Sequence, residues 1–287
     1  MVKINYIYNG EKNENCNFLE ITEKNRIKLV KLINKFNEID KDIEVNIVRF
    51  GQLKYEVDND PRIQTKSSND INSTYCSGKR FLPEELEVTF KNEKICYCCH
   101  NRDFKKTILT VFHELNHFRD PFDLGSYYIQ FQIDQNKLSP ETFLKCNIKI
   151  ALNEFNAEYQ VVKQLYSQDN LKEELINQAK GYLQRSFTTI IYNPFSLSNI
   201  DKIVQMFNVG FIRIFRFLGC WKGFYEIGDI FDLDIIWDQF ILNFHYDIIN
   251  PKIFKTIKSI IFKNQKDVKA IFEIFKIFFN EVFNLNL

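Results

Sequence analysis

Residues 107–119, near the middle of the chain, constrain the fold more than any other stretch. They read TILTVFHELNHFR, and their apolar positions recur at the 3.6-residue spacing of an amphipathic α-helix. Asp103 is a suitable N-cap for this helix, and Pro121 ends it. Residues four apart on a helix lie one turn above each other, so His113 and His117 point the same way and can share one metal ion.

Glu114 lies one helical step, about 100°, from His113, so it can sit beside a shared ion without binding it. Together His113, Glu114 and His117 spell H-E-x-x-H, a pattern in which two imidazoles bind zinc and the glutamate is a general base. Zinc lowers the pKa of a bound water, and the carboxylate takes its proton, which gives a nucleophile for peptide hydrolysis. The alternative is two surface histidines on an amphipathic helix.

A catalytic zinc ion normally has three protein ligands, so a third must be found elsewhere. Glu154 and Glu158 lie one turn apart on a helix expected from Ser139 to about Tyr166, where they interrupt an apolar stripe. Burying two unpaired carboxylates is costly, so the pair calls for a cation. We expect Glu154 to be the third ligand and Glu158 to accept a hydrogen bond from a liganding imidazole.

Other third ligands stay open. They are Asp123, six residues after His117, Glu158 itself, or one of the clustered cysteines, which are Cys96, Cys98 and Cys99. Peptide hydrolysis also needs a group that stabilises the developing oxyanion. The candidates for that role are His245, Tyr246 and Tyr159.

The order of elements predicts an α+β fold. The expected elements before the motif helix are a strand at 3–8, a helix at 22–36, a strand at 42–50 and a hairpin formed by 86–90 and 94–98. Further helices follow at 139–166, 171–185, 200–218, 232–245 and 251–283. We expect a catalytic lobe over residues 1–185 and an all-α C-terminal lobe over residues 186–287, with the Lys-bearing stretch 252–269 as an alternative membrane-surface segment.

The combination of motifs resembles a known group of enzymes. H-E-x-x-H at 113–117 followed by N-E-x-x-x-E at 153–158 is similar to the gluzincin arrangement of zincin metallopeptidases, and Glu154-Phe155-Asn156-Ala157 resembles the ImmA/IrrE-like peptidases. The resemblance covers about residues 1–170, and Asn116 stands where a glycine is common. It implies a zincin-like lobe with a small mixed sheet, one Zn²⁺ ion, and a metalloendopeptidase acting on a protein or peptide substrate.

Composition narrows the partners and the compartment. The formal net charge of +1 gives no basic field for nucleic acid, so a nucleic-acid partner is not expected. No run of eighteen apolar residues and no signal peptide is visible, so no transmembrane segment is expected. Seven cysteines, three of them clustered, fit reduced thiols in a cytoplasm, with leaderless secretion as the alternative. The oligomeric state is not predicted.

A second class of function fits the same motif. The chain could be a non-catalytic regulatory or binding protein with a structural zinc site. Glu114 argues against this reading, because a structural site needs no base, and a fourth protein ligand would argue for it.

Overall fold

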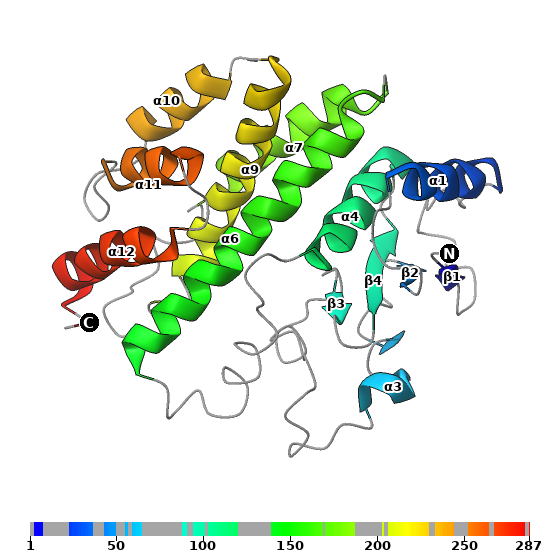
Figure 1. The fold of residues 1–287 in the computed structure, drawn as a ribbon, viewed down its shortest axis with the longest axis horizontal. Coiled ribbons are helices and arrows are strands. Elements are labelled where there is room, and N and C mark those ends of the chain that lie inside the picture. The colour runs from blue at the N-terminus through cyan, green and yellow to red at the C-terminus, as the bar shows by residue number, and fades with distance from the viewer. Residues whose placement is uncertain are drawn as a thin grey trace. The chain divides into compact units, whose positions relative to one another are not determined.

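The computed structural model divides the chain into two compact units, Met1–Ile133 and Asp134–Leu287. It describes residues 3–7, 23–36, 43–49, 55–56, 59–64, 88–90, 94–100, 103–119, 139–168, 170–186, 203, 206–229, 233–243, 252–263, 267–284 and 287. The first unit contains a mixed sheet with helices, and the described part of the second is helical (Figure 1). The α+β class predicted from the sequence is therefore confirmed.

The first unit is built on a four-stranded sheet with the order β1-β2-β4-β3. Its strands are β1 (Lys3–Ile7), β2 (Glu44–Arg49), β3 (Val88–Phe90) and β4 (Ile95–His100). Strands β1, β2 and β4 are parallel, and β3 is antiparallel to β4. The predicted hairpin is thus confirmed, with β3 at an edge of the sheet.

Two longer helices of this unit match the sequence pattern. Helix α1 (Glu23–Phe36) follows β1, and α4 (Phe104–His117) follows β4 after a short connection. Asp103 caps α4 as predicted, because its side chain accepts a hydrogen bond from the Lys105 backbone N–H. Helix α4 packs against β4, the inner strand that it follows in the chain. The packing against inner strand β4 therefore positions the motif helix.

A network of charged and polar side chains joins α3 (Pro61–Gln64) to the sheet. Arg62 donates hydrogen bonds to Asp60 and to Glu44 on β2, and the Tyr97 hydroxyl on β4 donates to Asp60 at 2.5 Å. Burial alone would raise the pKa of Asp60, but the hydrogen bonds from Arg62 and Tyr97 outweigh it and lower that pKa. The hydrogen bond from Arg62 likewise lowers the pKa of Glu44.

Replacing Asp60 with asparagine is expected to destabilise the protein by about 1.5–3 kcal/mol at pH 7, the range for hydrogen bonds to charged groups. A carboxyl whose pKa is lower in the folded state contributes stability above its unfolded pKa of about 3.9, and this contribution is lost as the pH falls through the folded value. The difference between wild type and Asp60→Asn should therefore shrink at acid pH. Urea denaturation followed by circular dichroism at pH 7 and below pH 4 measures it, and a difference independent of pH would contradict the assignment.

The second unit consists, in its described part, of helices. They are α6 (Pro140–Leu165), α7 (Lys172–Arg185), the π-helical turn η3 (Phe207–Phe211), α9 (Ile212–Ile227), α10 (Leu233–Asn243), α11 (Lys252–Lys263) and α12 (Val268–Phe283). Ser139 caps α6 and Pro140 begins it, as predicted. The predicted helices at 139–166 and 171–185 are confirmed.

Helices α6 and α9 form the most extensive helix contact of this unit and run side by side in Figure 1. Two glycines of α9 make the close approach possible. A Cβ on Gly219 would lie 2.2 Å from the Phe155 carbonyl oxygen, and one on Gly223 would lie 2.8 Å from the Val162 Cβ. Only glycine fits at these positions, so residues of α9 near Gly219 are brought against the stretch of α6 that carries Glu154 and Glu158.

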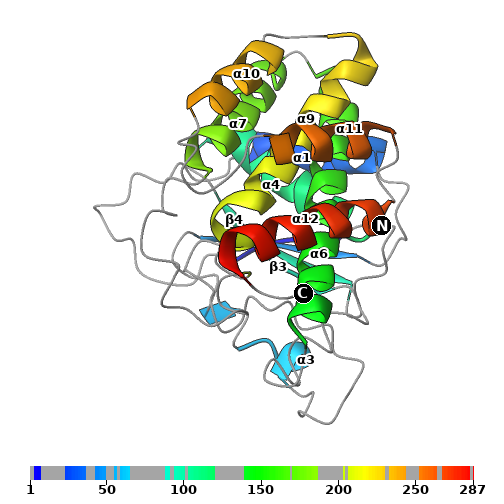
Figure 2. The same cartoon turned by 90° about the vertical axis from the view of Figure 1, so that its left-hand side faces the viewer.

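The remaining helices bury an aromatic core. The ring of Phe211 contacts four other rings, which belong to Phe254, Phe275, Phe278 and Phe279. Helix α12 lies across α6, as Figure 2 shows, and α11 packs on α12. Helix α11 buries its apolar residues in this unit and exposes Lys252 and Lys255. The bundle interpretation of stretch 252–269 therefore fits better than the membrane-surface alternative, since the apolar face is already covered.

The division of the chain at Ile133 differs from the predicted lobe boundary at residue 185. The physical reason is packing: α6 and α7 bury their apolar faces against α9 and are part of the same helical unit.

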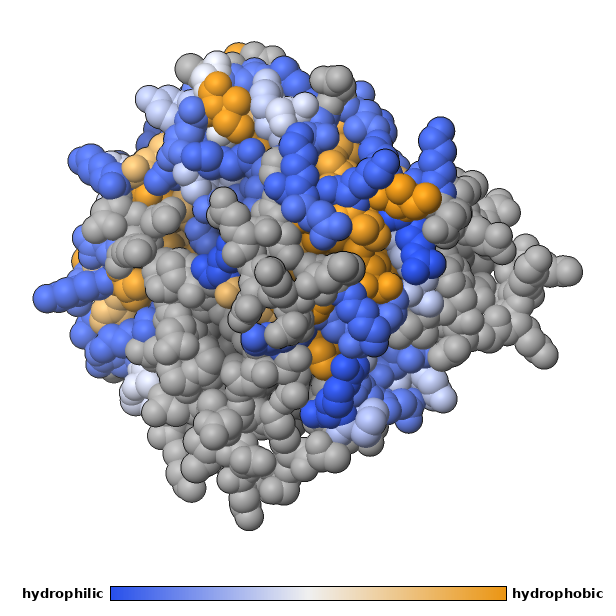
Figure 3. Space-filling view, turned by 45° about the vertical axis from the view of Figure 1, so that its right-hand side comes forward, coloured by the Kyte–Doolittle hydropathy of each residue, from blue (hydrophilic) through white to orange (hydrophobic). Residues whose placement is uncertain are grey.

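Apolar residues lie between hydrophilic ones on the face shown in Figure 3. Within the described residues, no helix combines the length and the apolar character needed to cross a membrane.

Candidate metal centre

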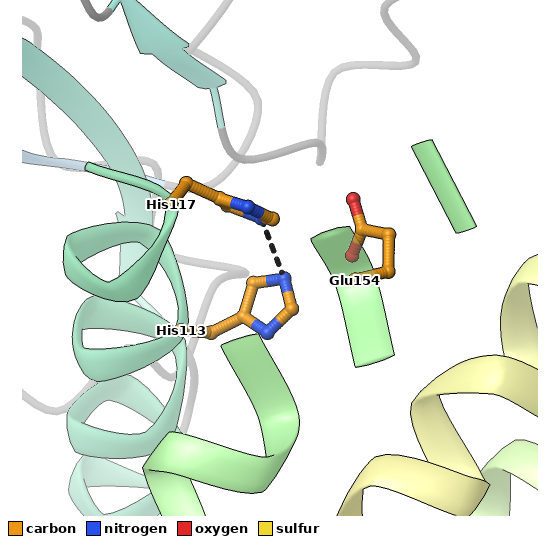
Figure 4. Close-up of side chains that lie close together, drawn as sticks. All are labelled: His113, His117 and Glu154. Carbon is orange, nitrogen blue, oxygen red and sulfur yellow. Dashed lines mark hydrogen bonds between the residues drawn. The ribbon is translucent and has the colours of Figure 1, made fainter. Parts of the chain in front are cut away.

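The two histidines of the motif lie on the buried side of α4. His113 and His117 are 5% and 8% exposed, and their rings meet edge to face with centroids 4.6 Å apart. Their Nε2 atoms are 3.0 Å apart (Figure 4). Two surface histidines would be solvated and independent. The surface alternative is therefore wrong, because both rings are buried and turn the same nitrogen toward one point.

Glu114 is buried beside this pair. Its side chain is 6% exposed, and its Oε1 atom lies 4.0 Å from the His113 Nε2 atom. The carboxylate is thus next to the two facing imidazole nitrogens, in the place that the helical step between residues 113 and 114 predicts. A buried carboxylate at that distance can accept a proton from a group held at the imidazoles.

Glu154 lies on α6, with its side chain 15% exposed. Arg216 of α9 donates from Nε to its Oε2 atom at 2.8 Å, and the Nη2 atom of Arg216 forms an ion pair with the same oxygen at 2.6 Å. The preceding residue, Asn153, is buried, and its Oδ1 atom has no hydrogen-bond partner among the residues that the structure describes. Glu154 is therefore a partly buried carboxylate whose geometry is fixed by a charged neighbour.

One group among the described residues could hold a metal ion, and it consists of His113, His117 and Glu154. One ligand atom from each lies within 4.8 Å of the others, and Figure 4 shows the three side chains together. The set offers two imidazole nitrogens and one carboxylate oxygen. These are the three residues that the sequence predicts as ligands, and their binding of a metal ion stays a prediction.

Glu158, the predicted support for a liganding imidazole, is fully buried one turn further along α6. Its carboxylate accepts hydrogen bonds from the Tyr182 hydroxyl at 2.5 Å and from Gln178, and the Cys220 thiol lies 3.5 Å away. Burial raises the pKa of both Tyr182 and Cys220 well above their ordinary values, so both groups are protonated donors. The support of a histidine by Glu158 stays a prediction.

The remaining candidates are placed differently or lie outside the described residues. Tyr159 is on α6, and its hydroxyl donates to Glu226, while Lys163 donates to that hydroxyl at 3.2 Å. Five residues on a helix turn by about 140°, so Tyr159 points away from Glu154. Three candidates, His245, Tyr246 and Asp123, are outside the described residues. Cys96 and Cys98 are buried in the sheet, and the side chain of Cys99 is not described.

Sequence reasoning missed Arg216 and Tyr182. A signal for Arg216 was present, because it is a charged residue in the apolar run IRIFRFLGCW at 212–221 and stands three residues before Gly219. No such signal was present for Tyr182, because the chain contains 13 tyrosines and the sequence pattern of α7 does not distinguish Tyr182 from the others.

Comparison with known proteins gives no family, because no family model matches the chain and neither the curated proteins nor the solved structures include a significant match. The resemblance to gluzincins and to ImmA/IrrE-like peptidases rests on the residues at 113–117 and 153–158 alone.

Proposed function

We propose that the protein is a zinc-dependent metalloendopeptidase of gluzincin type, with a zincin-like catalytic region. One observation carries the proposal: His113, His117 and Glu154 form a mostly buried group with two facing imidazole nitrogens, and Glu114 lies beside it. These are four residues of two motifs separated by 36 positions in the sequence.

The donor set fits zinc. Catalytic zinc is bound by sets such as two histidines and one glutamate, which leave a fourth position open to solvent or substrate. Two Zn–N bonds of about 2.05 Å that meet at a tetrahedral angle place the nitrogens about 3.3 Å apart. The Nε2 atoms of His113 and His117 are 3.0 Å apart, close to that value. Among the described residues three donors form the group, a number typical of catalytic rather than structural zinc.

The chain's own residues supply the acid–base chemistry. A zinc ion, when bound, would lower the pKa of a water molecule and polarise the substrate carbonyl. Glu114 accepts the proton of the attacking water and later returns it to the leaving amine. Its burial, with 6% of the side chain exposed, keeps this proton transfer away from bulk solvent. Arg216 and Glu158 act on the ligands rather than on the substrate.

We infer that the substrate is a protein or peptide and that the protein acts in the cytoplasm. Strand β3 lies at an edge of the sheet that the described strands form, and an extended peptide could pair with an edge of this kind. Among the described cysteines, Cys96, Cys98, Cys146 and Cys220 are buried thiols that form no disulfide. Thiols of this kind are typical of a reducing compartment.

Metal analysis tests the site directly. The purified protein is expected to retain one zinc ion per chain, as measured by plasma mass spectrometry after gel filtration. Replacing His117 or Glu154 with alanine removes a donor and should lower the zinc content to well below half. The matched control is Glu141→Ala, which removes an exposed carboxylate of the same helix that pairs with Lys145. Full zinc content in Glu154→Ala would transfer the ligand role to Asp123 or Glu158.

A further inference from the structure

We propose that Arg216 is the residue that positions Glu154 for metal binding, an inference that rests on the proposed zinc site. Glu154 alone has several rotamers and two equivalent oxygens. Arg216 restricts the rotamers, because its guanidinium makes a hydrogen bond and an ion pair with the carboxylate. Arg216 is thus a positioning residue and touches neither substrate nor metal.

The contacts of Arg216 restrict the position of the Glu154 carboxylate. The Nε atom of Arg216 donates to Glu154 Oε2 at 2.8 Å, and its Nη2 atom forms an ion pair with the same oxygen at 2.6 Å. A guanidinium usually binds a carboxylate through two parallel hydrogen bonds, one to each oxygen. Here two guanidinium nitrogens lie against one carboxylate oxygen, which restricts the movement of the Glu154 side chain. The two side chains are 28% and 15% exposed, so the hydrogen bonds are shielded from most of the solvent.

Arg216 is itself held in place from two directions. Gly219, one turn later on α9, allows α9 to approach α6 closely enough for the guanidinium to reach Glu154. The guanidinium also lies over the ring of Tyr182, with its carbon 5.7 Å from the ring centroid. The Tyr182 hydroxyl donates to Glu158. One array of side chains therefore orients both carboxylates of the N-E-x-x-x-E motif.

The charge of Arg216 and its hydrogen bonds have opposite effects on zinc affinity. A positive charge near a cation site weakens binding, so removal of the charge alone should tighten it. Loss of the hydrogen bonds releases the Glu154 side chain and should weaken binding, because outer-shell partners of metal ligands typically contribute about 10–100-fold to affinity or activity. Weaker binding therefore identifies positioning, and tighter binding identifies simple repulsion.

The test measures zinc affinity by competition with a chromogenic chelator in the full-length protein. Arg216→Met and Arg216→Lys should each bind zinc about 10–100-fold more weakly. Lysine keeps the charge but lacks the planar fork, and it carries the test if the methionine variant does not fold. The matched control is Arg213→Met, which removes the same charge one turn earlier on α9, where Arg213 donates to the Arg185 carbonyl. The control should bind zinc as tightly as wild type or more tightly.

A double-mutant cycle separates this inference from the proposed zinc site. If Arg216 acts through Glu154, Arg216→Met should have no further effect on zinc affinity in the Glu154→Ala background. Wild-type affinity in Arg216→Lys, or tighter binding in Arg216→Met, would overturn the positioning role and leave the zinc site intact. A wild-type protein that binds no zinc would overturn both.

Discussion

Replacing Glu114 with glutamine is expected to reduce peptide hydrolysis by about 10²–10⁴-fold, the usual contribution of a general acid–base residue. Glutamine has nearly the same shape as glutamate but cannot take a proton from water. Glu114 is not among the three proposed metal ligands, so the zinc content should remain at the wild-type level. Hydrolysis is measured with quenched-fluorescence peptides, and in cells by comparing the protein fragments produced by the wild-type and Glu114→Gln forms.

The control for this substitution is Glu141→Gln, which makes the same change at an exposed carboxylate on α6. It should alter neither hydrolysis nor zinc content. Two results would contradict the mechanism. If Glu114→Gln hydrolyses peptides at the wild-type rate, Glu114 is not the general base. If a folded Glu114→Gln protein has lost its zinc, Glu114 is a metal ligand.

Replacing Gly219 with alanine is expected to lower the free energy of unfolding by about 3 kcal/mol, at the upper end of the usual cost of overpacking. Alanine is intrinsically the better helix former by about 1 kcal/mol, so the sign of the effect comes from packing alone. The new Cβ would lie 2.2 Å from the Phe155 carbonyl oxygen and 3.1 Å from the Glu158 Cβ. Backbone cannot rotate out of the way as a side chain does, so α6 and α9 must separate.

Urea denaturation followed by tryptophan fluorescence suits this measurement, because both tryptophans, Trp221 and Trp237, lie in the helical unit. The matched control is Gly181→Ala on α7, where an added Cβ meets nothing within 4 Å. That variant should be more stable than wild type by about 0.5–1 kcal/mol, from helix propensity and reduced freedom of the unfolded chain. A Gly219→Ala protein as stable as wild type would contradict the close helix contact.

The sequence predicted those features that depend on neighbouring residues. The spacing of apolar residues gave the helices α1, α4, α6 and α7, and the caps Asp103 and Ser139 gave the beginnings of α4 and α6. The facing of His113 and His117 also followed from helix geometry, since they are one turn apart. Each of these features is determined by residues that lie close together in the sequence.

Features that depend on distant residues were harder to predict. The sheet order β1-β2-β4-β3 requires pairing across long connections, and no local pattern encodes it. The boundary expected at residue 185 rested on a Pro-containing break, whereas the units follow the burial of α6 and α7 against α9. Arg216 was missed for the same reason, because its partner Glu154 is 62 residues away.

The two glycines of α9, Gly219 and Gly223, also help to identify related chains. Substitution at Gly219 or Gly223 pushes backbone or a Cβ out of place, so these positions have almost no freedom to vary, unlike most of the apolar residues around them. The spacing Arg-x-x-Gly-x-x-x-Gly, which begins at Arg216, follows H-E-x-x-H and N-E-x-x-x-E in the same chain. A three-part signature of this kind would discriminate among diverged genes more sharply than the five-residue motif.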